Sequence, residues 1–391
     1  MKAFKRITVF FIIFSISFNL YGCWDYREIN SLLIVTGVSI DRNTLNNKFI
    51  LTFEMFDPDA TGQFLEPVFI KSEGITVFDA IRKAIDKRGK RFYWAHCKVL
   101  FISKSIADDD ILSVLDLFNR DDELRPDIDL VITNTKYAYD VFYTKKNSNS
   151  ISYKIDESLN SFPSSGEFSK VSLNNYILLS SSEGIEPVIP LVSIEKCFMD
   201  YKTVVKGLAV FKNGKIVGYL SPDESKYYNI LLNKKFNGLI LLSENSKEYD
   251  NGKEKQNISL TLEVKKATTS IKPVIKDKKV VININVAIDA SIAEIDSNKI
   301  NFINKREREI LTKNASLFIK SNITNLIYVT QNELNSDILG FGKSIHMYDP
   351  KIWNEIYENS GDYFNDLYFN INVDLNLTNS GSNKKIIQEK Y

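Results

Sequence analysis

An apolar run near the amino terminus decides what the rest of this chain can be. Lys2, Lys5 and Arg6 precede it with no acidic residue, and the run extends from Ile7 to Leu20. A basic start followed by about 7–15 apolar residues is typical of a secretory signal peptide. The run is shorter than the roughly 20 apolar residues that a transmembrane helix needs. The sequence therefore predicts that residues 1–22 are a signal peptide and that the remaining chain folds outside the cytoplasm.

The junction after this run carries a cysteine. Leu20, Gly22 and Cys23 have the spacing of a bacterial lipobox, in which the cysteine is acylated and becomes the new amino terminus; Tyr21 departs from that pattern, which usually has a small or aliphatic residue there. Two or more acyl chains hold a protein stably on a membrane. We therefore predict lipidation at Cys23 and a membrane-anchored, extracytoplasmic lipoprotein. The alternatives are an ordinary signal peptide followed by a chance cysteine, or an uncleaved anchor.

The composition of the remaining chain fits a body with real hydrophobic cores. Removal of residues 1–22 leaves 369 residues, and the loss of three basic residues moves the formal net charge from +1 to −2. No basic patch of the kind that binds nucleic acid stands out. The length predicts two or three domains, and the hydrophobic content of 44% is ample for their cores.

Strand and helix patterns alternate in the first half. Short β-branched runs predict buried strands, and apolar residues at helical spacing predict the helices between them. Thr76 and Asp79 have the spacing of a capping box, and Gly89 predicts the end of that helix. Such alternation indicates a layered α/β arrangement. The expected strands are 31–40, 48–56, 92–102 and 129–133, and the expected helices are 76–89 and 108–119.

The second half has a different order of elements. Asn213-Gly214 predicts a tight hairpin, and Ser221-Pro222 predicts the start of a helix. Strands at 257–268, 279–289 and 368–377, with a long helix at 304–335, do not alternate regularly, so this half reads as α+β with antiparallel pairing. Residues 145–183 are expected to be loops with one or two short helices. The predicted division is 1–22 signal peptide, 23–200 mixed α/β region, which can hold two domains, 201–378 α+β domain and 379–391 polar tail.

The sequence shows little that could support catalysis or a cofactor. His96 and Cys97 are adjacent on an expected strand, so they should point to opposite faces and not act on each other. Gly340-Phe341-Gly342 lacks the preceding strand and third glycine of a dinucleotide site and is expected to form a turn. Cys97 and Cys197 can pair in an oxidising compartment, or each can be a small buried apolar residue. We predict no enzyme, no cofactor and no metal site.

Several stretches taken together resemble the Ger(x)C family of spore germination lipoproteins. Each stretch alone is weakly specific, and their order along nearly the whole mature chain is what carries the resemblance; Tyr26 departs from it, where a basic residue is usual. The stretches are Gly22–Glu28, the strand Val35–Val38 with Asp41, Trp94–Leu100, Leu115–Arg120, Gly207–Phe211 with Gly218, Asp337–Gly342, and Pro350 with Trp353.

The resemblance implies a function that the residues alone do not supply. Members of this family are C subunits of nutrient germinant receptors in endospore formers, on the outer face of the spore's inner membrane. Their fold consists of three mixed α/β domains, and catalysis is not expected of them. Their partners are an A-type subunit and a B-type, permease-like subunit. The resemblance therefore implies a non-enzymatic, membrane-anchored receptor subunit needed for assembly or signalling.

Two other functions and two contact surfaces stay open at this point. A solute-capturing lipoprotein of an envelope transporter would suit two globular halves with a cleft, and an envelope hydrolase would need a catalytic group that we do not find. Beside the anchor, Trp24, Asp25, Arg27 and Glu28 can contact the bilayer or a partner, or Trp24 can simply pack at the edge of the fold. The basic helix face can lie on anionic headgroups or be plainly solvated; it consists of Arg82, Lys83, Lys87 and Arg88.

Overall fold

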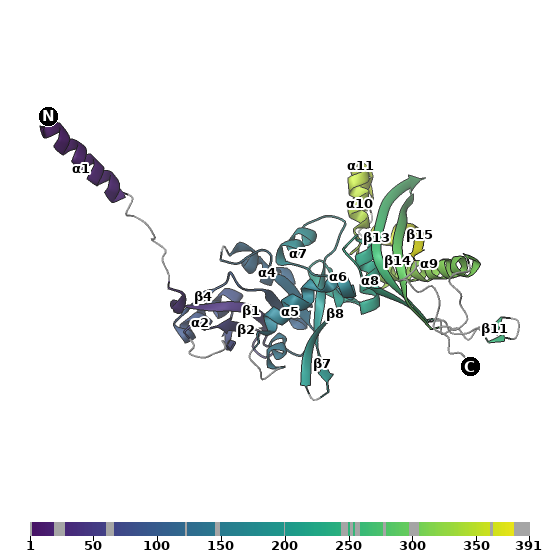
Figure 1. Ribbon diagram of the computed structural model, residues 1–391, viewed down its shortest axis with the longest axis horizontal. Helices are drawn as coiled ribbons and strands as arrows, with labels where there is room; N and C mark the ends of the chain where they lie inside the picture. The colour runs from purple at the N-terminus through teal and green to yellow at the C-terminus, as the bar shows by residue number, and fades with distance from the viewer. Residues whose placement is uncertain are drawn as a thin grey trace.

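Two sheets with their helices follow one another along the long axis of the molecule (Figure 1). They confirm the predicted multidomain mixture of α/β and α+β organisation. The computed structural model describes residues 2–18, 28–59, 66–121, 123–144, 149–198, 200–243, 249–250, 253–254, 259–276, 279–296, 305–359 and 363–378. The predicted tail 379–391 lies outside the described residues, and the predicted domain boundaries stay a prediction.

The amino-terminal apolar run forms helix α1 (Lys2–Phe18). Large apolar side chains along it are exposed, among them Phe4, Ile7, Phe10 and Phe11. In the part of the chain that the structure describes, no helix has both the length and the apolar character needed to cross a membrane. The signal-peptide assignment stays a prediction, because the junction from Leu20 to Asp25 lies outside the described residues.

The first sheet has nine strands, in the order β3-β2-β1-β5-β6-β7-β8-β9, with β4 also paired to β1. The β1, β5, β6 and β7 strands are parallel, whereas β2 and β3 on one side and β8 and β9 on the other are antiparallel to their neighbours. The strands are β1 (Leu32–Arg42), β2 (Phe49–Phe56), β3 (Val68–Gly74), β4 (Arg91–Tyr93), β5 (Val99–Ser103), β6 (Asp129–Thr133), β7 (Val188–Cys197), β8 (Asp200–Lys212) and β9 (Lys215–Leu220).

Helices cover the sheet and connect its strands. The segment 145–183 is expected to hold one or two short helices, and its described residues, 149–183, contain three. The helical elements of this part are η1 (Ile29–Ser31), α2 (Val77–Arg88), α3 (Lys104–Ala107), α4 (Ile111–Arg120), η2 (Ala138–Tyr143), α5 (Ile151–Asn160), α6 (Phe162–Ser165), α7 (Leu173–Ser180) and α8 (Pro222–Leu231).

Local signals place the helix ends as the sequence predicts. Thr76 Oγ1 accepts a hydrogen bond from Asp79 N at the start of α2, and Gly89 ends the helix at φ 66°. The Asp79 carboxylate accepts from Ile75 N, one residue before the expected position, so the capping box of α2 is only half formed. At α8 the reciprocal bonds between Ser221 and Glu224 are both present.

The prediction of one strand over residues 92–102 is wrong, because the structure has two separate strands there. Its first part is β4, which pairs with β1 from Leu32, and its second part is β5, which pairs with β1 from Gly37. Between them the chain turns, with Cys97 N donating to Trp94 O at 2.8 Å. The irregularity of β1 between Val35 and Gly37 separates the two pairings.

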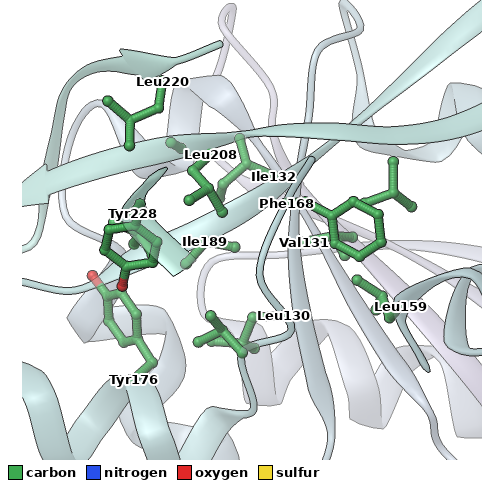
Figure 2. Close-up of a cluster of buried hydrophobic side chains, with 14 of the residues drawn as sticks. Leu130, Val131, Ile132, Leu159, Phe168, Tyr176, Ile189, Leu208, Leu220 and Tyr228 are labelled. Carbon is green, nitrogen blue, oxygen red and sulfur yellow. The ribbon is translucent and has the colours of Figure 1, made fainter. Parts of the chain in front are cut away.

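A continuous hydrophobic core runs from the first sheet into α8. Figure 2 shows strand residues Ile189 and Leu208 close to Tyr176 of α7 and Tyr228 of α8. Tyr176 is fully buried and Tyr228 is 2% exposed. Helix α8 therefore belongs to the packing of the first sheet as much as to the second half of the sequence. The labelled cluster is Leu130, Val131, Ile132, Leu159, Phe168, Tyr176, Ile189, Leu208, Leu220 and Tyr228.

The second sheet has four strands in the order β10-β13-β14-β15, with helix α9 packed against β15. β14 and β15 are parallel, so the antiparallel pairing that the turns of this half favoured is wrong for its last strand. β11 (Tyr249–Asp250) and β12 (Lys253–Glu254) pair with each other as a separate two-stranded sheet. The other elements of this half are β10 (Leu239–Ser243), β13 (Ser259–Lys276), β14 (Lys279–Asp296), α9 (Lys305–Tyr328), the π-helical turn η3 (Val329–Glu333), α10 (Phe341–Tyr348), α11 (Pro350–Asn359), η4 (Tyr363–Asp366) and β15 (Tyr368–Thr378).

Candidate functional site

The chain enters its folded body at the amino end of β1. Glu28 is exposed, and its carbonyl accepts hydrogen bonds from Ser31 N at 3.0 Å and Ser31 Oγ at 2.7 Å, which form the short turn η1. Ile29 in this turn is 64% exposed. The other predicted contact and lipidation residues, Cys23, Trp24, Asp25 and Arg27, lie outside the described residues. Their proposed anchor therefore stands five residues before the first described residue of the body.

Charged side chains at this edge are paired with one another. Lys90 Nζ lies 2.7 Å from Asp57 Oδ1 and 2.8 Å from Asp59 Oδ2. The hydrogen bond from Lys90 holds the pKa of Asp57 below its usual range. Arg91, at the start of β4, pairs with Glu123. In the described part of this edge, Lys90 and Arg91 therefore each have an acidic partner beside them.

The basic face of α2 is partly occupied by contacts within the chain. Lys83 Nζ lies 2.7 Å from Asp79 Oδ2, and Lys87 Nζ donates to Lys71 O at 2.8 Å. The Arg82 guanidinium lies 4.9 Å from the centroid of the Phe78 ring. A groove with a volume of ≈ 920 Å³ runs between α2 and the end of α4, with Phe92 and Trp94 among its lining residues. Three of the four basic side chains, Arg82, Lys83 and Lys87, therefore have contact partners within the chain itself.

Two buried carboxylates hold helix starts against the first sheet. Asp41 accepts hydrogen bonds from Ala138 N at 2.5 Å and Tyr139 N at 3.3 Å at the start of η2. Burial raises the pKa of Asp41 to about 7. Glu54 accepts from Ile151 N at 2.6 Å and Ser152 N at 2.9 Å at the start of α5. Carboxylates at helix amino termini are favourable because free N–H groups and the helix dipole meet there.

The first sheet and the carboxyl-terminal segment meet at a close backbone contact. A Cβ placed on Gly184 would lie 2.4 Å from the carbonyl carbon of Gly342. Lys343 N donates to Gly184 O at 2.8 Å, and Glu186 N donates to Asp337 O at 2.9 Å. We call this contact the joint, formed by residues 183–186 and 337–343.

Polar side chains complete the joint. Asp337 is 4% exposed and accepts hydrogen bonds from Phe341 N, Gly342 N and the Tyr363 hydroxyl. Burial raises the pKa of Asp337 to about 6, against the opposing effect of these hydrogen bonds. Trp353, fully buried, donates from Nε1 to Glu183 Oε2 at 3.0 Å. Burial also raises the pKa of Glu186, whose carboxylate accepts from Asn213 N. The joint therefore links α7, the β8–β9 turn and the last helices.

The structure brings together two of the motifs that the sequence singled out. The stretch Asp337–Gly342 forms part of the joint, and Trp353 contacts it through Glu183. Gly340 at φ 70° makes the expected turn, whereas Phe341 and Gly342 already belong to helix α10. A cavity of ≈ 350 Å³ beside the joint is lined by residues including Glu186, Asp337 and Tyr363. Sequence reasoning missed Glu54 and Glu183; a lone acid in the apolar strand Phe49–Phe56 was the available signal for Glu54.

The pair His96-Cys97 is separated as expected, though by a turn and not by strand alternation. His96 is exposed and its ring lies 5.9 Å from that of Tyr93, whereas Cys97 is 3% exposed. Burial raises the pKa of Cys97 to about 12, so its thiol stays protonated and is not an activated nucleophile. Cys97 and Cys197 are both free thiols. Among the described residues, no three His, Cys, Asp or Glu side chains group as metal ligands.

Comparison with protein families finds two matches in succession. The family described as "Spore germination protein N-terminal domain" matches residues 25–194. The family described as "Spore germination B3/ GerAC like, C-terminal" matches residues 206–381. Together they span both sheets and the joint between them.

Individual relatives align along nearly their whole length. The Spore germination protein B3 of Bacillus subtilis (strain 168) is 26% identical over 390 residues, covering 97% of this chain and 99% of the relative. The Spore germination protein KC of the same organism is 25% identical, with 95% of each chain covered. The crystal structure of the GerBC protein superposes with a TM-score of 0.57 at 22% identity, covering 87% of this chain and 96% of that one, which shows a shared fold.

Proposed function

Since the chain belongs to the Ger(x)C family of spore germination proteins, we propose that it is the C subunit of a spore nutrient germinant receptor, anchored to the membrane by lipid on Cys23. The observation that carries this role is the ordered match of both family regions, residues 25–194 and 206–381, with an end-to-end relative. The chain serves in spore germination, and its role there is binding and not catalysis.

The proposed subunit works by being held beside its partners. Acylation of Cys23 places the folded body on the outer face of the spore's inner membrane, five residues from Glu28. Confinement to that surface raises the effective concentration of A-type and B-type subunits, so weak contacts suffice for assembly. Backbone hydrogen bonds of the joint hold the carboxyl-terminal segment against the segment that precedes β7.

Germination of spores that lack this gene tests the proposal. Loss of optical density is followed with nutrient mixtures and, separately, with a non-nutrient trigger. We expect failure with at least one nutrient set and a normal response to the non-nutrient trigger. Normal germination with every nutrient, in a strain that also lacks the sister receptor genes, would contradict the proposal and favour the solute-capturing alternative.

A further inference from the structure

The β7–β8 hairpin extends beyond the sheet that holds its base. β6 pairs with β7 only at Leu191 and Val192, and β9 pairs with β8 only from Leu208 onward. The ends of the two strands, residues 193–197 and 200–204, pair with each other alone. Figure 1 shows β7 and β8 projecting from the body as a two-stranded ribbon. We call residues 193–198 and 200–204 the ribbon end.

The apex of this ribbon carries an aromatic residue in an unusual backbone conformation. Cys197 pairs with Asp200, so two residues connect the strands, and the first of them is Phe198. Phe198 has φ 56° and its side chain is 96% exposed. Positive φ is uncommon for bulky residues, and two-residue hairpins that need it favour Asn, Asp or Gly.

The chain itself supplies the comparison. In the described residues the other non-glycine positions with positive φ are all asparagine, at Asn47, Asn213, Asn233 and Asn335. Phe198 therefore accepts the strain of this conformation and gains no burial within the chain in return. A backbone outlier of this kind motivates a functional hypothesis, and aromatic side chains, Phe among them, are enriched in the cores of protein interfaces.

A groove lies along one flank of the ribbon end. It has a volume of ≈ 500 Å³ and lies between α5 and the first residues of β8. Tyr201, two residues after the apex turn, lines it and is 54% exposed. On the opposite wall lie Lys154 and Glu157 of α5. The ribbon end thus offers an apical ring, a second aromatic side chain and a concave flank.

Charge and position favour a protein over a bilayer as the occupant. Asp200 directly flanks the apex, Glu195 lies opposite Lys202 in the strand register, and the Glu195 carboxylate pairs with Lys206 Nζ at 3.4 Å. Charges of both signs therefore lie near Phe198, where a headgroup-binding tip would be basic. β7 is linked to β1 by a series of parallel pairings. The ribbon therefore leaves the sheet at the carboxyl ends of these strands, whereas the proposed anchor precedes the amino end of β1.

We infer that the ribbon end is a docking surface for a protein partner, and that Phe198 inserts into an apolar pocket of that partner whose rim carries charges of both signs. This inference rests on the proposed function in one respect, namely that the partner is an A-type or B-type subunit. An apolar anchor surrounded by a polar rim is the common anatomy of such interfaces.

Co-purification from spore membranes tests the inference. The full chain, with its lipidation signal and an affinity tag, is compared with the variants Phe198→Asn and Leu45→Asn. Asparagine suits positive φ, so Phe198→Asn removes the ring without straining the turn. Leu45, 95% exposed in the turn after β1, is the matched control. We expect Phe198→Asn to lower the A-type and B-type subunits recovered per bait at least tenfold, and Leu45→Asn to change them less than twofold.

Each other outcome overturns a defined statement. Equal recovery with wild type and Phe198→Asn overturns the docking surface and leaves the proposed function intact. Absence of both subunits even with wild type overturns the proposed function and this inference with it. A tenfold loss in both variants shows a non-specific effect and overturns the assignment to Phe198. Phe198-dependent binding of the unlipidated chain to phosphatidylglycerol vesicles would show that the tip binds a bilayer and would overturn the protein docking surface.

The thermal midpoint of Phe198→Asn controls for folding. A midpoint no lower than that of wild type excludes misfolding; if it is lower, the same co-purification is repeated with Phe198→Gly, which also suits positive φ.

Discussion

Gly184 and Gly342 pack backbone against backbone, with Lys343 N donating to Gly184 O at 2.8 Å. There is no room at this contact for a methyl group, since a Cβ on Gly184 would lie 2.4 Å from two backbone atoms. One glycine precedes β7 of the first sheet and the other lies at the start of α10, so the contact joins distant parts of the sequence. An added side-chain atom on Gly184 would therefore force these two segments apart.

Substitution of Gly184 should open the joint. Gly184→Ala adds a methyl group against backbone at a position with φ 70°, and we expect a loss of about 2–4 kcal/mol in the free energy of unfolding. Gly89→Ala is the control, because Gly89 has φ 66° but nothing within 4 Å of its added Cβ; it should lose only about 1 kcal/mol. Urea unfolding of residues 24–391 measures both. Equal losses would show that the contact adds nothing to the conformational strain.

The buried carboxylate of Glu54 should be needed as a carboxylate. It accepts from two backbone N–H groups and from the hydroxyls of Ser150 and Thr36. Glu54→Gln places an NH₂ group against these donors, and we expect a loss of about 2–4 kcal/mol of unfolding free energy. Glu73→Gln, at an exposed position of β3, should change it by less than about 0.5 kcal/mol. Chemical unfolding at pH 7 distinguishes the two, and matching values would refute the role of Glu54.

Asp41 should make stability depend on pH. Its pKa in the folded chain, about 7, lies above the usual 3.8, so the folded state holds a proton that the unfolded state has lost. This carboxyl therefore favours folding most below about pH 4, and the advantage falls as pH rises through 7. The quantity to compare is the free energy of unfolding of Asp41→Asn minus that of wild type. This difference should be more favourable to the variant at pH 8 than at pH 5, by on the order of 2–4 kcal/mol. A difference between variant and wild type that is constant from pH 5 to 8 would contradict this.

Lipidation should depend on Cys23. Without its thiol no acyl chain can be attached, so the stable anchoring that two or more acyl chains provide is lost. We expect Cys23→Ala to release most of the chain from spore membranes and to slow nutrient germination, whereas Cys197→Ala should do neither. Membrane fractionation and optical density provide the readouts. Retention and germination equal to wild type in Cys23→Ala would remove the anchor from the proposed function.

The sequence by itself determined those features that depend on neighbouring residues. Ser221, Pro222 and Glu224 fixed the start of α8, Asn213-Gly214 fixed the β8–β9 turn, and Gly89 fixed the end of α2, because caps and turns are governed by the φ angles and hydrogen bonds of a few consecutive residues. The order of motifs from Gly22 to Trp353 also indicates the family without reference to the fold.

Tertiary structure alone decided what depends on partners far along the chain. It divided residues 92–102 between two pairings with β1, and it set β15 parallel to β14. It also brought Glu54 to Ile151, and Gly184 to Gly342. Strand register, burial of a charge and close backbone approach depend on which surfaces meet. Because the hydrophobic effect is non-directional, a local sequence pattern predicts that a strand is buried but not which element it packs against.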